Sequence, residues 1–585
     1  MKFNKLFILG IASMLTFSGC DDFLDSQDYT GKNSTNFPST TEDVNKMVAA
    51  VYKSTFYGPF QGNNLEQYFS VANIMSDDMF GGAGVGDPWW QGLDHLMYAQ
   101  TNQMQDLWTY SYEAIARANS ALAVIDNIPD EETRNQTKGE LLFMRAYNYY
   151  NLVLAFNNVP IIEKAPETVE EAQIAPEQRE GKEVLKLIAD DLYEACECMP
   201  SYPYDGWSKL AFGKVTRWAA ETLLARAFLF YTGFYGESEM PKTEGSINKQ
   251  YVVEKLDDCI KNSGHDLLSD YRSLWAYSNQ YTAKDYDFVK DMTEAGTCYK
   301  EGNKEVILAI NFQYQPAWSD KLHLTNQYGL FFGIRADNNN ADDERFHVGT
   351  ATSVYPFSTG WGCGTVATNL VSDWKNIEPD DPRRDASILA FPASLKPETF
   401  SDACELTMYH NKKIPSVRSA GGKRLSWSLD QMGADPTETG NYQASNCTPL
   451  IVYRFADVLL MYSELTQDAA TLNRVRNRVG LPAVAYSDQA LRNERRWELA
   501  FEGSRWDDLR RWGIAGEALA KQAGQVMYNC GKPTTMPEAG GGYKQRYNET
   551  KGFYRIPKSQ IDLSGGKYKQ NAGWEDDTKT QFAGY

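Results

Sequence analysis

Residues Leu450–Gly513 read LIVYRFADVLLMYSELTQDAATLNRVRNRVGLPAVAYSDQALRNERRWELAFEGSRWDDLRRWG. From Tyr453 onward, apolar residues recur at the three- and four-residue spacing of a helix that buries one face. Arg454 and Asp457 are spaced to pair with each other on that helix. The stretch therefore predicts an amphipathic helix with charges held inside a largely apolar pattern.

A second helix is expected to follow a clear stop. Gly480 and Pro482 are typical of a helix exit, and Ser487 and Asp488 are placed to cap the next helix. The side chains expected to form its buried face are Leu491, Trp497, Leu499, Phe501 and Trp506. We therefore predict two packed helices and the start of a connector.

The second helix carries carboxylates at every fourth residue, Glu494, Glu498 and Glu502, interleaved with arginines that include Arg495 and Arg505. Carboxylates one helical turn apart approach the separation of about 5–5.5 Å that a retaining glycosidase uses. A general acid needs a raised pKa, however, and each neighbouring arginine lowers the pKa of a carboxyl group. We therefore predict a structural ion network that braces packed helices.

Residues 1–19 have the pattern of a secretory signal, with a basic start and an apolar stretch too short to span a bilayer. The sequence Phe17-Ser18-Gly19-Cys20 resembles a lipobox, so we expect cleavage before Cys20 and lipidation of that residue. Acyl chains would then anchor the protein without a transmembrane helix. The alternative is an ordinary signal in which Cys20 has no role. Residues 20–40 are polar and predict a tether.

Composition excludes several classes of function. The net charge of −19 argues against nucleic acid and anionic lipid as partners, because both require clustered Lys and Arg. Five scattered histidines and the lack of a CxxC pair of zinc type argue against a His- or Cys-based metal site. Export permits disulfides, but the nine cysteines suggest no pairing. Aromatic residues make up 13% of the chain.

Three regions of different character follow the tether. Residues 41–235 have helical periodicity, and small residues facing large aromatics suit antiparallel helix pairs of the tetratricopeptide kind. Residues 236–449 are rich in Gly, Asn, Asp and Pro and contain short β-type runs, which predicts a loop-rich insertion that binds ligand. Residues 450–585 are expected to complete one folded unit with 41–235. The predicted fold is mainly α, a tetratricopeptide-like superhelix with short strands in the insertion.

The first candidate binding segment is Ser76–Trp90, SDDMFGGAGVGDPWW. Sugar rings need an aromatic platform for their apolar face and planar polar groups for their hydroxyls. Asp77 and Asp78 supply carboxylates, and Trp89 and Trp90 supply rings beside a glycine-rich turn. The alternative is that both tryptophans pack against the helices.

A second candidate group lies in the insertion and consists of Tyr314, Trp318, Tyr328 and Trp361. For each of them, core packing is the alternative to ligand contact. The acidic run Asp337–Arg345 has enough oxygen ligands for Ca²⁺, but it lacks the glycine and terminal Glu of an EF-hand loop, so a solvated loop is favoured. We predict no cofactor and no catalytic residue.

Several motifs resemble one family. The helix YRFADVLLMYSE, the exit LNRVRNRVGLP and the run RNERRWELAFEGSRWDDLRRWG resemble the C-terminal signature of the SusD/RagB family of Bacteroidetes. Tyr554–Trp574 resembles that family's closing motif, with Ala572 where proline is usual. Leu141–Pro160 resembles its FxRAxxYFxLxxxYGxVP helix, with Asn157 and Asn158 in place of Tyr-Gly.

The resemblance implies a function as well as a fold. It implies a tetratricopeptide-like scaffold, lipid anchoring to the outer membrane at the cell surface, and binding of a glycan without catalysis. It also implies a SusC-like TonB-dependent transporter as partner, and a binding Asp and Trp in the Ser76–Trp90 region. Two alternatives remain: a peptide-binding uptake component, as for some RagB-type relatives, and an exported glycoside hydrolase.

Overall fold

The computed structural model describes residues 37–584, except 58–66, 85, 167, 169–170, 172–173, 314–323, 336–352, 401–404, 419–423 and 426–445. The predicted signal, Cys20, the tether before residue 37 and the Asp337–Arg345 run therefore lie outside the described residues, as do Tyr314 and Trp318. Within the described part, no helix is long and apolar enough to cross a membrane.

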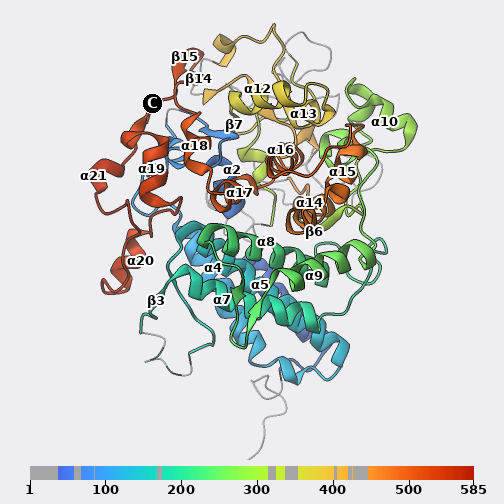
Figure 1. Ribbon diagram of the computed structural model, residues 1–585, viewed down its shortest axis with the longest axis vertical. Coiled ribbons are helices and arrows are strands. Elements are labelled where there is room, and N and C mark those ends of the chain that lie inside the picture. Colours follow the sequence, from blue (N-terminus) through green and yellow to red (C-terminus); the bar gives the residue numbers. More distant parts are fainter. Residues whose placement is uncertain are drawn as a thin grey trace, which may run out of the picture.

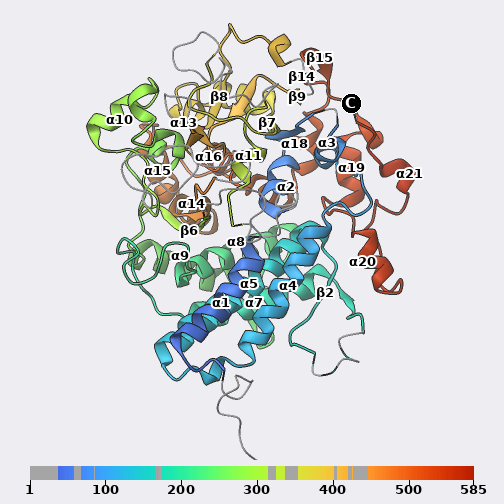
Figure 2. The same ribbon diagram turned by 180° about the vertical axis from the view of Figure 1, so that it is seen from behind.

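The first half of the chain forms a stack of long helices at the lower end of the molecule (Figures 1 and 2). Its members are α1 (Thr41–Phe56), α4 (Gln105–Leu122), α5 (Glu131–Phe156), α7 (Gly181–Cys198), α8 (Arg217–Tyr235) and α9 (Lys249–Asn262). Successive members pack on each other, and α1 also packs on α4 and α5. Side-chain caps fix several starts; for example, the Asp130 carboxylate accepts a hydrogen bond from Thr133 N–H (2.8 Å). The stack runs through Asn262, beyond the change of composition near residue 236.

The signature stretch forms more elements than its periodicity predicts. It contains β13 (Leu450–Arg454), α14 (Phe455–Thr466), α15 (Ala469–Arg478), α16 (Asp488–Glu498) and α17 (Arg505–Arg511). The prediction of two helices was wrong, because Gln467 adopts a left-handed conformation (φ 57°) that ends α14, and residues 499–504 separate α16 from α17. The predicted exit at Gly480 and cap at Ser487 are confirmed: Gly480 has φ +76°, and Ser487 Oγ accepts from Ala490 N–H.

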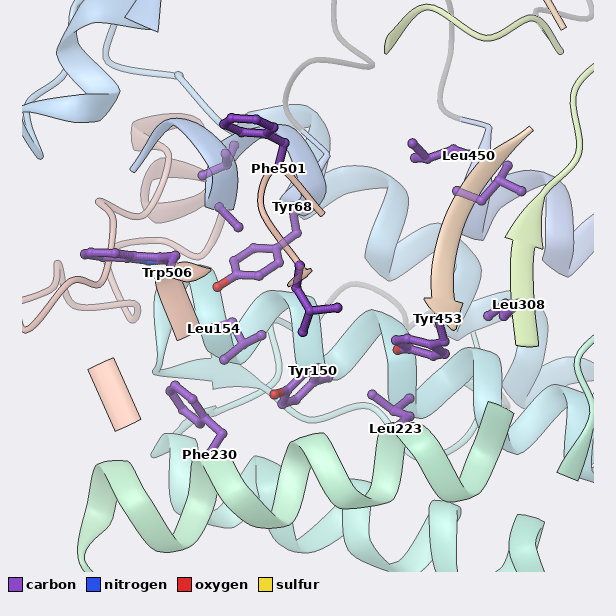
Figure 3. Close-up of a cluster of buried hydrophobic side chains, with 14 of the residues drawn as sticks. Tyr68, Tyr150, Leu154, Leu223, Phe230, Leu308, Leu450, Tyr453, Phe501 and Trp506 are labelled. Atoms are coloured by element: carbon purple, nitrogen blue, oxygen red, sulfur yellow. The ribbon is translucent and has the colours of Figure 1, made fainter. Parts of the chain in front are cut away.

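The C-terminal helices continue the helical stack. Helix α14 packs on α9, and α17 packs on α8. Figure 3 shows where they meet: Tyr150, Leu154, Leu223 and Phe230 from the first half face Trp506 and Tyr453 from the signature stretch. Strand β13 pairs with β6 (Val306–Ile310) in an antiparallel ladder beside this core. The predicted fold class, a mainly helical scaffold with short strands, is confirmed.

Between α9 and β13 the elements are short. The helices there are α10 (Lys290–Ala295), α11 (Tyr328–Phe331), α12 (Thr368–Ile377) and α13 (Pro382–Ser387), and the strands besides β6 are β7 (Cys363–Val366), β8 (Ile388–Ala390), β9 (Glu405–Leu406), β10 (Tyr409–Asn411), β11 (Val417–Arg418) and β12 (Arg424–Leu425). Two of the pairings stay within this region, β8 with β10 and β11 with β12. The others join distant parts of the chain: β1 (Met79–Gly82) pairs with β7, and β9 pairs with β14 (Val526–Asn529).

The remaining elements are also short. They are α2 (Tyr68–Ile74), α3 (Pro88–Asp94), β2 (Val159–Pro160), β3 (Gln178–Arg179), β4 (Met240–Pro241), β5 (Ser246–Ile247), α18 (Ala515–Ala520), β15 (Lys532–Thr535), α19 (Tyr543–Thr550), α20 (Lys558–Leu563) and α21 (Asp577–Thr580).

The last residues return to the start of the chain. Tyr98 bridges to Gln581, and the His95 ring lies between Tyr543 (4.6 Å between ring centres) and Phe582 (4.7 Å). The C-terminal segment thus packs against the residues that directly follow α3.

Core packing should dominate the stability of the helical scaffold. Leu459 on α14 is fully buried, and its replacement by alanine should lower the free energy of unfolding by about 2–5 kcal/mol. Leu563 on α20 is 78% exposed, so Leu563→Ala, the same chemical change, should stay within about 0.5 kcal/mol. Denaturant unfolding followed by circular dichroism measures both; equal losses would contradict this assignment of the core.

Candidate functional site

The pairing of β1 with β7 brings the two candidate binding segments together. Met79 lies opposite Val366 and Gly82 opposite Cys363, and Ala83 N–H donates to the Gly362 carbonyl (2.8 Å). Gly81 allows β1 to lie close to α3, because a Cβ there would lie 2.4 Å from the carbonyl carbon of Trp90. The Ser76–Trp90 segment and Trp361 are therefore neighbours in the fold, although they are far apart in sequence.

Four partly exposed residues form a patch at this junction, which we call the Trp89–Trp361 patch: Asp87, Trp89, Arg335 and Trp361. Arg335 links its two sides, since Nη1 lies 3.1 Å from an Asp87 carboxylate oxygen and 3.4 Å from the Trp361 carbonyl. The Trp361 ring packs edge-on against Phe331 (4.9 Å between ring centres). The patch combines aromatic rings, a carboxylate and a guanidinium, which are the groups that recognise sugars.

Two of the predicted aromatic platforms are core residues in this structure. Trp90 is 2% exposed and lies beneath Trp89, 3.9 Å between ring centres. Tyr328 is 3% exposed and packs edge-on against Phe69 (5.3 Å). Of the described candidates, Trp89 and Trp361 keep part of their surface available.

Asp77 and Asp78 are also buried, each 2% exposed. Arg505 holds Asp77 with two hydrogen bonds of 2.8 and 2.9 Å, and Arg496 Nη2 lies 2.7 Å from an Asp78 oxygen. Burial raises the pKa of Asp77, but the two guanidinium groups outweigh it and hold that pKa well below its usual range. For Asp78, burial dominates and the pKa is raised. In this conformation the pair ties the binding segment to α16 and α17.

The carboxylate ladder of α16 pairs with arginines from other elements. Arg383 contacts both Glu494 and Glu498, and Arg454 contacts Glu498 and Glu502; both arginines are almost fully buried. Arg476 and Arg478 of the same stretch also contact Glu494 and Glu498, respectively, whereas the interleaved Arg495 and Arg505 pair with other carboxylates. Consecutive side chains of a helix point in different directions, so the interleaved arginines face other partners.

Arg495 belongs to a second cluster. It contacts Asp457 (2.9 Å) and Asp508 (2.8 Å), and Asp457 also binds Arg226 of α8 (2.8 Å). The predicted pairing of Arg454 with Asp457 was wrong, because Arg454 lies at the end of β13 and reaches Glu305 and Glu498 instead. These contacts join the two halves of the helical stack through buried charge.

The glycosidase alternative meets a geometric obstacle at this ladder. Burial raises the pKa of Glu494; for Glu498, Arg478, Arg454 and Arg383 outweigh burial and lower the pKa well below its usual range. Two neighbouring carboxyl groups whose pKa values are shifted in opposite directions are typical of the acid and base pairs of hydrolases. Both side chains are fully buried, however, so a substrate has no path to either carboxylate in this structure.

One buried carboxylate near the patch was not anticipated. Glu405 of β9 is fully buried, and its N–H donates to the Ala83 carbonyl (3.0 Å) while Gln91 donates to its side chain (2.5 Å). Burial raises the pKa of Glu405 to about 8, with Asp94 and Asp87 adding to the rise. Neither Glu405 nor Arg335 stands out in sequence, because only the folded chain places them beside residues 83–91.

Metal and disulfide sites can be addressed only for the described part of the chain. There, no group of three or more His, Cys, Asp or Glu side chains is placed to hold a metal ion. Six cysteines within the described ranges are free thiols: Cys196, Cys198, Cys259, Cys298, Cys363 and Cys530.

Comparison with known proteins identifies the family. One family model, described as "SusD family", matches residues 331–574, and a second, described as "Starch-binding associating with outer membrane", matches residues 22–229. The chain belongs to the SusD family. The resemblance of the signature motifs is thus confirmed.

Relatives within the SusD family match nearly the whole chain. SusD-like protein P2 of Formosa agariphila is 23% identical, with 88% of this chain and 92% of the relative covered. A SusD-like protein of Bacteroides ovatus is 22% identical, with 87% and 82% covered. The structure of a "Laminarin binding SusD-like protein" superposes with a TM-score of 0.65 at 23% identity, covering 91% of this chain and 99% of that one. Surface glycan-binding protein A from Bacteroides thetaiotaomicron in complex with laminarihexaose gives 0.66 at 18% identity, with 91% and 100% covered.

The Arg383 cluster yields a stability prediction. Arg383→Met leaves Asp381, Glu494 and Glu498 with one fewer buried counter-charge, so the free energy of unfolding should fall by about 3–5 kcal/mol. The adjacent Arg384 lies 3.5 Å from the exposed Asp385, so the control Arg384→Met should change stability by less than about 1 kcal/mol. Chemical unfolding of both variants measures the two changes. A similar decrease in the free energy of unfolding for both would contradict a particular role of the Arg383 cluster in stability.

Glu405 predicts a dependence of stability on pH. Its folded pKa of about 8 lies above the unfolded value, so the folded state retains a proton that the unfolded state releases. This contribution is complete below the unfolded pKa, about 4.3, and is lost as pH rises through 8. Glu405→Gln removes the titration, so its stability relative to wild type should increase from pH 5 to pH 8. Urea midpoints at both pH values measure the difference, and an unchanged difference would contradict the assignment.

Proposed function

We propose that this protein binds a glycan, an oligo- or polysaccharide, at the Trp89–Trp361 patch. The single observation that carries this proposal is that Arg335 joins Asp87, two residues before the half-buried Trp89, to the carbonyl of the half-buried Trp361. Stacking on the rings holds the apolar faces of the sugars, while the charged pair offers donors and an acceptor to hydroxyl groups. The similar structures of a laminarin-binding SusD-like protein and of a surface glycan-binding protein in complex with laminarihexaose support this ligand class.

We further propose that the protein acts at the outer membrane. Lipidation of Cys20 would anchor it, residues 20–40 would serve as tether, and a SusC-like TonB-dependent transporter would receive the glycan. The family description "Starch-binding associating with outer membrane" supports the location. In this proposal the helical scaffold positions the patch, and the ligand passes from it to the transporter pore.

The proposed role is binding without catalysis. The clearest carboxylate pair, Glu494 and Glu498, is sealed in the core by Arg383. Aromatic stacking contributes about 0.5–1.5 kcal/mol per ring, so single contacts are weak and a polymer gains affinity through repeated engagement.

The test uses the ectodomain that starts after Cys20, run through native affinity gels that contain different polysaccharides. Trp89→Ala and Trp361→Ala should each weaken retardation by a factor of about 2–10, which corresponds to the loss of one stacking contact. Trp512, half-buried at the end of α17 and held by Arg511 and Glu464, is not part of the patch and provides the matched control: Trp512→Ala should bind like wild type.

A reducing-sugar assay on the same samples addresses catalysis. Retardation without release of sugar is the expected result. Release of reducing ends by the wild type would replace the binding role with that of a hydrolase. Absence of retardation by every polysaccharide, together with binding of peptides, would favour a peptide-uptake role instead.

A further inference from the structure

A pocket of about 520 Å³ opens between α1, the loop 211–214 and the exit of β6. In Figure 2, α1 runs along the front of the N-terminal stack and β6 lies above it. No residue of this pocket belongs to the Trp89–Trp361 patch. The two regions are separated by α11, whose Tyr328 packs toward Phe312 beside the pocket and whose Phe331 packs against Trp361.

The walls of the pocket are aromatic and fixed by hydrogen bonds. The rings of Tyr52 and Phe56 come from one face of α1, 5.8 Å apart, and Phe212 comes from the loop. Tyr52 Oη donates to Glu140 (2.9 Å) and accepts from Val215 N–H (2.6 Å), so its ring cannot swing away. Asn311 Nδ2 donates to the Phe212 carbonyl (2.7 Å), which ties the loop to the strand exit. The cavity is thus preformed.

The rim of the pocket carries unused hydrogen-bonding groups. The side chains of Asn45 and Lys53 from α1 and Gln313 from the strand exit line it. Among the described residues, none of these three side chains has a hydrogen-bond or ion-pair partner. Lys214, by contrast, is neutralised by Glu140 (3.1 Å). The rim therefore offers two amides and one ammonium group around an apolar interior.

This combination matches the surface of a pyranose ring. Aromatic walls suit the apolar ring faces, and amides supply both donors and acceptors to hydroxyl groups at the ring edge. The single uncompensated cation is too little charge for a phosphate-specific site, which uses several donors. The volume lies within the range of about 300–1,000 Å³ of small-molecule sites.

We propose that this pocket is a second carbohydrate site, which takes one or two pyranose residues of a neutral glycan. The inference rests on the proposed function, since it assumes that the protein meets glycan chains. Two separate sites on one protein hold a polymer at two points. Binding at the second site then becomes intramolecular, which raises the overall affinity for long chains without new contacts.

The test fills the pocket from its open side. Ala49 is an exposed pocket residue on α1, so Ala49→Trp places an indole in the cavity without disturbing the core. Lys46→Trp is the matched control, because Lys46 lies on the same helix, is 67% exposed and does not line the pocket. Thermal melts of both variants verify that they fold like wild type.

Isothermal titration calorimetry with a hexasaccharide measures the outcome, first with laminarihexaose and otherwise with the hexamer of whichever polysaccharide retards the wild type. The Trp89→Ala/Trp361→Ala variant should still bind, and adding Ala49→Trp should reduce that residual affinity at least tenfold, whereas adding Lys46→Trp should not. Loss of all binding in the double variant, or no effect of Ala49→Trp, would overturn the second site while leaving the proposed function intact.

Two further outcomes separate the possibilities. If wild type binds no glycan in gels or calorimetry, the proposed function itself fails and the second site with it. The protein can instead bind N-acetyltryptophanamide but no sugar, with that binding lost in Ala49→Trp. The pocket then accepts a peptide side chain, and the carbohydrate assignment is overturned.

Discussion

The structure depends on arginines, fully or partly buried, that pair with buried carboxylates from distant parts of the chain. Arg226 binds Asp457, Arg383 binds the α16 ladder, and Arg505 binds Asp77. A buried charge without its partner is strongly unfavourable, whereas a satisfied network fixes one arrangement of the elements. Hydrophobic packing allows helices to slide on each other, but these contacts fix the position of α16 relative to α8, α13 and the binding segment. The arrangement of the Trp89–Trp361 patch therefore depends on these buried ion pairs.

The sequence predicted what depends on local pattern. Helical periodicity identified the scaffold, and the stop at Gly480 and the cap at Ser487 follow from backbone chemistry within a few residues. The break at Gln467 was missed, because a left-handed residue that is not glycine leaves no clear compositional mark. The contact of Arg383 with Glu494 and Glu498 was not foreseen for a related reason: spacing along a helix shows which charges are close in sequence, not which arginine comes from another element.

The candidate site, like the fold, could be predicted only in part from the sequence. Residue type drew attention to residues 76–90 and to Trp361, since paired tryptophans and glycine-rich turns are unusual, and the fold brings these segments together. It could not distinguish Trp89 from Trp90, because one-residue differences in orientation decide which ring faces solvent. Arg335, which joins the two halves of the patch, has no local signal at all. It became visible only through the antiparallel pairing of β1 with β7.

The return of the C-terminal segment to α3 has a kinetic consequence. The His95 ring is enclosed only when Tyr543 and Phe582 reach it, from more than four hundred residues later in the chain. Contacts of such long sequence separation form slowly, because loop closure must precede the gain from packing. The helix that carries Trp89 is therefore completed late in folding. A folding chain thus forms its N-terminal helices before its candidate binding face is complete.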